Sequence, residues 1–390
     1  MKILYMNWNS YGNLDMQAAL EKLGYELSIY NYSTKTDRND AVFEEDLGQG
    51  IRAYAPDFVF SFDYFPVISK VCNKCDVTYV SWVYDNPHVN LYSYTTANPC
   101  NRIFVFDKQE YLFFHNNGIN TVHYLPLAAN PDRLHPRDCT EAPGQKAEIS
   151  FVGSLYTEPK HQLYTRLQDI TPYTRGYLDA LLQAQKRIYG YTFIEELLNE
   201  KILEDMKKAC PCPPNYDGVE SQEYLYSNYF LLRQVTAMER EEIIRLLSRK
   251  YPLQLYTNDR SYACEGCTNH GPADYYTEAP RIFYGSKINL NITLRSIKSG
   301  IPLRAFDIMG SRGFLLTNYQ EDFLDFFEPD VDFVYYDSME DLMGKVDYYL
   351  SHERERQEIA ENGYEKVRRE HTFEARIPIL FENTDIKNKA

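Results

Sequence analysis

The sequence predicts an α/β chain of two doubly wound domains, each a parallel sheet with helices on both faces. Two observations carry this prediction. Short segments rich in apolar and β-branched residues alternate with helical patterns along most of the chain, and several of these segments are too continuously apolar to face water on one side. At 390 residues, the chain is also long enough for two domains with a core each.

The first domain is expected over residues 1–128, with a return of the chain at 373–390. Its strands are predicted at 2–8, 26–32, 57–62, 77–84, 102–107 and 122–127. Helical patterns at 16–23 and 108–116 separate some of these strands. Pro126, Pro131 and Pro136 then mark a linker to the second domain.

The second domain is expected over residues 129–372. Its strands are predicted at 149–152, 253–257, 287–293, 314–318 and 332–336. A helical insertion of about residues 163–250, broken by a Cys/Pro-rich turn, separates the first two strands. Two such domains leave a cleft between the carboxyl edges of their sheets, where ligands of doubly wound sheets bind. Site candidates should therefore follow directly after strands.

Composition excludes several classes of function. The formal net charge of −15 argues against a nucleic-acid partner, which would need a basic face. No apolar run approaches the length of a membrane span, and Met1 leads directly into a strand with no signal peptide. We therefore expect a soluble, cytoplasmic protein.

The segment 286–317 carries the strongest local signal, because it has the pattern strand, loop, helix and strand. Pro302 fits the first turn of the helix. A helix N-terminus at the carboxyl edge of a parallel sheet is an anion site, and a diphosphate is the expected ligand. Four basic residues accompany it in the sequence: Lys287, Arg295, Lys298 and Arg304. Arg304 and Asp307 share one face of the helix. The alternative to a ligand-binding role is a surface ion pair for these two residues and a solvated position at the edge of a strand for Lys287.

The run from Gly300 to Thr317, GIPLRAFDIMGSRGFLLT, resembles the sugar-nucleotide site of GT-B glycosyltransferases. It most resembles the CgeB-like spore-maturation group, which is distantly related to family 4 glycosyltransferases. The resemblance covers nearly the whole chain, with supporting segments at 81–87, 124–129, 151–154, 290–291, 326–329, 359–364 and 370–376. One departure is that family 4 enzymes usually carry two glutamates with seven residues between them, where this chain has Ser299 and Asp307.

The resemblance implies a GT-B fold and transfer of a sugar from a UDP-sugar or similar donor to a glycan, protein or cell- or spore-surface acceptor. It implies no cofactor and no metal, because a helix N-terminus and basic side chains stabilise the leaving phosphate. Arg304 and Lys287 are the candidates for that catalytic role. The donor-binding candidates are Gly153, Ser154, Asn291, Gly300, Ile301, Arg304, Asp307 and Gly313.

An inverting transferase also needs a base on the acceptor side. Asp85 and His88, directly after the predicted strand 77–84, are the best-placed candidates, and Asp63 is the next. A retaining transferase needs none, and Asp85 also fits an Asx turn ahead of Pro87. The rival functions are a nucleotide-sugar epimerase on the same scaffold and a non-catalytic nucleotide-sugar-binding protein.

Two motifs suggest metal ligands, although we expect none. Asp330 and Asp332 fit the DxD pattern of metal-dependent transferases, but they precede a strand and are far in sequence from the phosphate candidates. Cys264, Cys267 and His270, with Cys210 or Cys212 as a fourth ligand, have zinc-like residue types. Ordinary free thiols are the default interpretation of these cysteines.

Overall fold

The computed structural model describes residues 1–33, 38–134 and 147–382, which divide into two units. The first unit comprises Met1–Ala128, Pro214–Glu220 and the chain from His371 onward. The second unit comprises Ala129–Pro213 and Ser221–Glu370. Residues 383–390 of the expected return, and Pro136 of the expected linker, lie outside the described residues.

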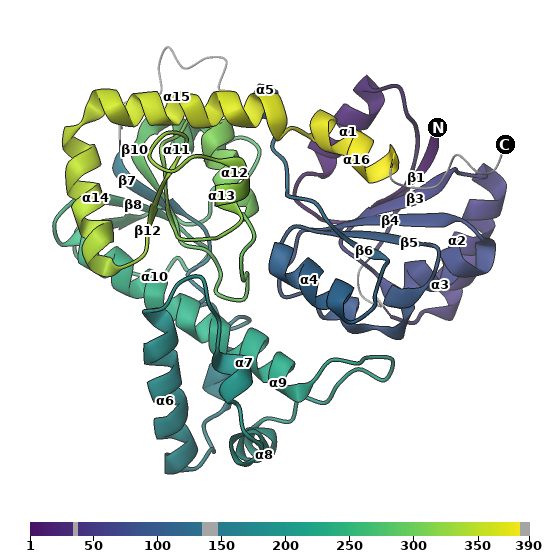
Figure 1. Cartoon of the computed structure of the whole chain (residues 1–390), viewed down its shortest axis with the longest axis horizontal. Coiled ribbons are helices and arrows are strands. Elements are labelled where there is room, and N and C mark those ends of the chain that lie inside the picture. Colours follow the sequence, from purple (N-terminus) through teal and green to yellow (C-terminus); the bar gives the residue numbers. More distant parts are fainter. Residues whose placement is uncertain (34–37, 135–146, 383–390) are drawn as a thin grey trace. The chain divides into compact units, whose positions relative to one another are not determined.

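The first unit is built on a six-stranded parallel sheet in the order β2-β1-β3-β4-β5-β6. Its strands are β1 (Lys2–Asn7), β2 (Glu26–Asn31), β3 (Phe58–Phe62), β4 (Thr78–Val83), β5 (Asn101–Val105) and β6 (Val122–Tyr124). Helices α1 (Asn13–Lys22) and α16 (Phe373–Glu382) cover one face, and α2 (Ala41–Tyr54), α3 (Pro66–Cys75) and α4 (Lys108–Asn116) cover the other (Figure 1). All five residues of β3 are buried, as a strand covered on both faces requires.

Helix α16 shows how the chain returns to the first unit. The ring of Phe381 lies 4.5 Å from that of Phe58 on β3, and Phe373 lies edge-on to Trp82 of β4 at 6.1 Å. The Arg376 side chain also donates to the carbonyl of Pro126. These aromatic contacts bury the helix against the sheet, although about 250 residues of sequence separate it from β6, the first unit's last strand.

The second unit holds another parallel sheet, in the order β12-β11-β10-β7-β8-β9. Its strands are β7 (Ala147–Val152), β8 (Leu253–Tyr256), β9 (Cys267–Asn269), β10 (Ser286–Asn291), β11 (Leu315–Asn318) and β12 (Val334–Tyr336). Its principal helices are α10 (Leu232–Ser248), α11 (Ala279–Gly285), α12 (Leu303–Gly310), α14 (Met339–Ser351) and α15 (Glu353–Glu370). Ser338 caps α14 by accepting from the N–H of Asp341. The short edge strand β9 was not predicted.

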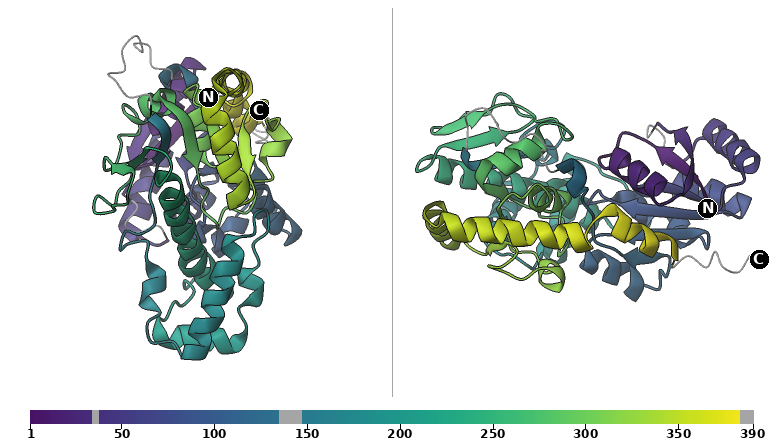
Figure 2. Two further views of the ribbon diagram at one scale, coloured as in Figure 1. Left: turned by 90° about the vertical axis from the view of Figure 1, so that its left-hand side faces the viewer. Right: turned by 90° about the horizontal axis from the view of Figure 1, so that it is seen from above.

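The helical insertion forms its own layer in the second unit. Helices α6 (Pro172–Lys186), α7 (Ile194–Leu197), α8 (Glu200–Ala209) and α9 (Gln222–Leu225), with a π-helical turn at Tyr226–Leu231, bury a separate apolar cluster against the start of α10. Figures 1 and 2 show these helices gathered beyond one end of α10. Within the described part of the chain, no helix combines the length and apolar character that a membrane span requires.

Part of the insertion departs from the sequence prediction, because Pro214–Glu220 belongs to the first unit. Asp217 is buried there and accepts from Arg38 at 2.6 Å and from the Ser93 hydroxyl at 2.8 Å. Gly218 forms an isolated antiparallel bridge with Ser93. These contacts join positions 124 or more apart in the sequence, so no local pattern indicates them.

Candidate active site

The centre of the candidate site in the second unit is the turn that follows β7. The guanidinium of Arg304, in the first turn of α12, lies directly over Gly153. A Cβ placed on Gly153 would be 2.7 Å from Arg304 Nη2. Gly153 also has a φ of +153°, which residues with a side chain rarely adopt. The close approach and the backbone conformation both require glycine here.

Two N–H groups of this turn are bonded within the protein. The N–H of Gly153 donates to the carbonyl of Tyr256 at 2.8 Å, and the N–H of Tyr156 donates to the hydroxyl of Ser154 at 2.9 Å. That hydroxyl in turn donates to Glu158 at 2.7 Å. Gly153 therefore contributes space for Arg304, and the positive charge comes from side chains.

A second arginine, Arg240 of α10, lies at the same turn. It is buried and donates to the carbonyls of Ser154 and Ile292, and its guanidinium lies 5.0 Å from the ring centroid of Tyr156. The pKa of Arg240 is lowered to about 10, chiefly by burial; Tyr156 opposes the lowering and the charge of Arg304 adds to it. Among the described residues, no carboxylate lies within ion-pairing distance of Arg240. Two guanidinium groups, those of Arg240 and Arg304, therefore meet at this turn, together with the carboxylate of Glu158.

The loop before α12 is held by side-chain bonds from the next strand connection. The amide of Gln320 donates to the carbonyls of Ile297 and Gly300, and the N–H of Asp322 donates to the carbonyl of Ser299. Gly300 and Ile301 are buried in this loop. Pro302 is extended, with ψ 151°, and is the N-cap residue, so the helix begins at Leu303, one residue later than predicted.

Asp307 and Asn291 are both buried at the carboxyl edge of the second sheet. Asp307, one turn along α12 from Arg304, accepts a hydrogen bond from the Tyr275 hydroxyl at 3.2 Å. Asn291 ends β10, and its amide donates to the hydroxyls of Thr293 and Thr317. Asn291 thus links neighbouring strands inside the sheet.

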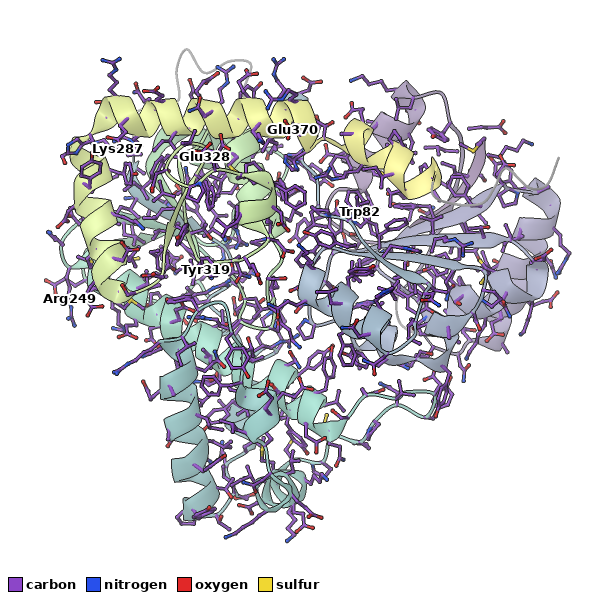
Figure 3. All side chains as sticks on the ribbon, in the orientation of Figure 1. Trp82, Arg249, Lys287, Tyr319, Glu328 and Glu370 are labelled. Atoms are coloured by element: carbon purple, nitrogen blue, oxygen red, sulfur yellow. The ribbon has the colours of Figure 1, made fainter. Side chains whose placement is uncertain are left out.

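The structure does not bring Lys287 together with Arg304. Lys287 stands at the start of β10, 3.8 Å from Glu148 at the start of β7. Figure 3 shows it at the end of the sheet opposite to Tyr319, which follows β11. Four residues of strand span about 13 Å, so Lys287 lies at the amino edge and not at the ligand edge. Gly313 is likewise beyond the far end of α12, where a Cβ would meet Asn289 Nδ2 at 2.8 Å, so it serves close packing.

Arg295 is also committed elsewhere. It forms a buried bidentate pair with Glu239, at 2.6 and 2.9 Å, and donates to the carbonyls of Lys186 and Ile188. It therefore anchors the insertion to the sheet and is not available to an anion. Lys298, half-buried, has Glu195 of the insertion as an electrostatic partner.

In the first unit, the acceptor-side candidates gather after β3 and β4. Asp63 is buried and accepts from the N–H groups of Tyr84 and Asp85 at 2.8 and 3.1 Å, while the Asp85 side chain is exposed. His88 Nε2 lies 2.9 Å from the carbonyl oxygen of Tyr64 and 3.2 Å from its nitrogen, so the ring donates or accepts according to its tautomer. Asp63 therefore fixes the loop that presents Asp85 and His88.

The pKa of Asp63 is raised to about 6, first by burial and then by the charge of Asp85, against the lowering effects of His88 and the two N–H groups. Between about pH 4 and pH 6 the folded state keeps a proton that the unfolded state has lost, so stability falls as pH rises through this window. We expect Asp63→Asn to remove about 2–3 kcal/mol of this dependence. Urea denaturation of the unmodified protein and of Asp63→Asn, at pH 4.5 and at pH 7, measures this dependence. A difference in unfolding free energy between the two proteins that is the same at both pH values would contradict the prediction. Asparagine tolerates the positive φ of 55° at this position.

The metal-ligand motifs are not assembled. Asp330 and Asp332 precede β12 at the amino edge of the sheet, where Asp332 accepts from the N–H of Glu328. Over residues 1–33, 38–134 and 147–382, no three His, Cys, Asp or Glu side chains gather as metal ligands would. His270 instead stacks on Tyr256 and bonds to Gln254. The zinc interpretation of Cys264 and Cys267 therefore lacks a third ligand among the described residues.

Sequence reasoning proposed Gly153 because it follows a strand, Arg304 because it is near a helix start, and Asp307 because it shares a helix face with Arg304. It missed Arg240 and Tyr275. Arg240 lies inside a long helix with many charged residues, and Tyr275 is one of 35 tyrosines, so neither had a distinguishing signal.

Comparison with known proteins gives one family match and several structures of similar fold. Residues 230–382 match the family described as glycosyl transferase-like. No curated protein matches the sequence significantly. The fold is similar to that of a glycosyltransferase from Rickettsia africae, with a TM-score of 0.54 at 10% identity over 100% of this chain and 99% of that one.

Two further solved structures share the fold over the whole of both chains. They are HepE of Anabaena, in complex with UDP and glucose, at 8% identity, and sucrose-phosphate synthase from Thermosynechococcus elongatus, at 9% identity, each with a TM-score of 0.54. The predicted GT-B fold of two Rossmann-like sheets is confirmed. The comparisons thus show a GT-B fold over the whole chain and a glycosyl transferase-like domain over residues 230–382.

Proposed function

We propose that this protein transfers a sugar from a nucleoside-diphosphate donor, with the diphosphate bound at the turn after β7. The observation that carries the proposal is the placement of two arginines, Arg304 and Arg240, around Gly153 at the carboxyl edge of the second sheet. Two guanidinium groups at the carboxyl edge of a doubly wound sheet suit a diphosphate. UDP is the proposed nucleotide, because the HepE structure of the same fold contains UDP.

Breaking the bond between the anomeric carbon and the diphosphate gives the leaving phosphate additional negative charge. Arg304 reaches the site from the first turn of α12, where the helix dipole adds positive potential. Arg240 is fixed by two carbonyls before any ligand arrives. Both groups stabilise the departing charge without rearrangement, which is the requirement for electrostatic catalysis. Asp307 is proposed to accept from the ribose hydroxyls.

On the acceptor side, we propose that the loop held by Asp63 presents Asp85 and His88 to the acceptor hydroxyl. The exposed carboxylate of Asp85 suits a base in an inverting reaction. The acceptor is proposed to be a glycan, a protein or a surface polymer, and the CgeB-like relationship remains part of this proposal. An epimerase and a non-catalytic binder are the alternatives, the latter because Ser299 stands where related enzymes carry a glutamate.

The experiment that separates these functions is incubation with UDP-, GDP- and TDP-linked sugars, followed by product analysis and thermal-shift measurement. A transferase releases nucleoside diphosphate slowly from one donor, even without acceptor. An epimerase interconverts two of the sugars, and a binder shows only a rise in melting temperature. Absence of all three responses would contradict the proposal.

Donor hydrolysis is expected to survive chelation by EDTA, because arginines supply the charge that a divalent metal supplies elsewhere. The measurement compares the rate of UDP release before and after chelation, and after addition of Mn²⁺. A loss of activity that Mn²⁺ restores would show that a metal is required.

Replacing Asp217 by alanine is expected to lower transfer to the acceptor at least about tenfold while leaving UDP binding unchanged. Asp217 holds Arg38, which donates to the carbonyl of Val89, the residue after His88. Loss of one partner of a buried ion pair frees that loop and costs about 3–5 kcal/mol. Tyr216→Ala, in the same segment but 68% exposed, is the matched control. An equal loss of acceptor transfer and UDP binding in Asp217→Ala would contradict this assignment.

A further inference from the structure

Cys264 and Cys267 are the end residues of a β-turn that the proposed function does not use. The N–H of Cys267 donates to the carbonyl of Cys264 at 3.2 Å, and Gly266, at the third position, has the positive φ (+71°) of a type II turn. Such a turn brings its end Cα atoms within about 7 Å, and disulfides span Cα distances of about 4.4–6.8 Å. The Cys264 thiol also contributes to the raised pKa of Cys267, so the two side chains are near enough to interact. They are therefore within bonding reach in the folded protein.

The surrounding structure fixes this turn. A Cβ on Gly266 would lie 1.8 Å from the carbonyl oxygen of Ser248, at the end of α10, so only glycine fits. The carbonyl of Gly266 accepts from the N–H of Leu253 at the start of β8, and Cys267 begins β9. The thiol pair is thus held by two elements of the second unit.

The two sulfur atoms have different surroundings. Cys264 Sγ lies 3.6 Å from the hydroxyl of Ser248, and the positive charge of Arg245 acts on the same thiol. A hydroxyl and a cationic side chain are therefore the neighbours of Cys264. Burial raises the pKa of Cys267 to about 12, with added contributions from its hydrogen bond to Cys264 and from the Cys264 charge. Cys267 is therefore the member of the pair that keeps its proton.

We propose that Cys264 and Cys267 form a reversible redox modification site that closes to an intramolecular disulfide on reaction with a peroxide. The Cys264 thiolate attacks hydrogen peroxide, the O–O bond breaks, and a sulfenic acid and hydroxide result. The Cys267 thiol then attacks the Cys264 sulfur, the S–S bond forms, and water leaves with the Cys267 proton. Two thiols and one peroxide give one disulfide and two water molecules.

The site adjoins the candidate phosphate turn through a short chain of contacts. Strand β9 leads to His270, whose ring stacks on Tyr256 with centroids 4.7 Å apart. The carbonyl of Tyr256 accepts the N–H of Gly153. Oxidation itself does not depend on the proposed function, so its test stands whether or not the protein proves to be a transferase.

The chain contains its own control pair with the same spacing. Cys72 and Cys75 lie in the last turn of helix α3. Residues three apart on a helix have Cβ atoms about 5–6 Å apart, beyond the 3.5–4.5 Å or so of a disulfide. Cys72 is also fully buried, and burial raises its pKa well above the ordinary value. This pair should resist oxidation under conditions that close the turn.

The test treats the full chain with hydrogen peroxide, alkylates it in denaturant and digests it with trypsin. Cleavage after Arg260 and Arg281 gives a peptide that contains both Cys264 and Cys267. We expect this peptide to be lighter by two hydrogen atoms and unalkylated, with full alkylation restored by dithiothreitol, while Cys72 and Cys75 are alkylated throughout. Full alkylation of the turn peptide after peroxide, or equal oxidation of Cys72 and Cys75, would overturn the proposal.

Serine variants test the order of the two steps. Cys267→Ser should stop at the sulfenic acid on Cys264, which dimedone captures, and Cys264→Ser should give no dimedone adduct in this peptide. An adduct on Cys267 in the second variant, at the same rate, would overturn the assignment of Cys264 as the attacking thiol. Both substitutions keep the size of the side chain, and the measurement on the unmodified protein is independent of them.

Discussion

Arg304→Ala is expected to weaken UDP binding by about 10- to 100-fold, because hydrogen bonds to charged groups contribute about 1.5–3 kcal/mol and each 1.4 kcal/mol is roughly tenfold in affinity. The melting temperature without ligand should hardly change. An arginine in the first turn of a helix is unfavourable with respect to the helix dipole, so its removal costs little folding free energy. Isothermal titration with UDP, together with thermal melting, measures both quantities.

Two further variants sharpen this test. Gly153→Ala should reduce UDP affinity in the same direction, because its Cβ would occupy the position of the Arg304 guanidinium. Arg312→Ala is the control, since Arg312 follows the far end of α12 and pairs with Glu361 at 3.5 Å. Undiminished UDP binding in Arg304→Ala, or an equal loss in Arg312→Ala, would place the nucleotide elsewhere.

The sheets were predictable because buried parallel strands leave a strong signal in sequence. The residues Phe58–Phe62 are apolar except for one serine, and every one is buried. Strand β9 was missed because its three residues, Cys267–Asn269, carry no β-branched or apolar pattern beyond one threonine. The place of Pro214–Glu220 could not be predicted, since it depends on the ion pair of Arg38 with Asp217, far apart in the sequence.

The candidate site also has residues whose placement the sequence predicts and residues whose placement it does not. Gly153 and Arg304 were predicted from their positions after a strand and at a helix start, and the structure brings them into contact. Lys287 was grouped with Arg304 by closeness in sequence, but the first residues of a parallel strand lie at the edge opposite to the ligand edge. Strand direction therefore decides which neighbouring basic residues reach the site.

The buried pair of Glu239 and Arg295 should carry the largest effect on stability. The Glu239 side chain is fully buried and also accepts from the Tyr189 hydroxyl at 2.6 Å. The guanidinium of Arg295 lies 4.0 Å from the centroid of the Tyr189 ring. Burial alone would lower the pKa of Arg295, but the Glu239 carboxylate outweighs it and the pKa is raised. The pair thus depends on both partners being present.

Glu239→Ala is expected to lower the free energy of unfolding by about 3–5 kcal/mol, because it leaves the Arg295 charge buried without its carboxylate. The double variant Glu239→Leu with Arg295→Met should lose less than the sum of the two single variants, since it removes both charges and keeps apolar volume. Urea denaturation of the unmodified protein, Glu239→Leu, Arg295→Met and the double variant gives the coupling energy. Additive losses would show that the two side chains stabilise the insertion independently, in conflict with the bidentate contact at 2.6 and 2.9 Å.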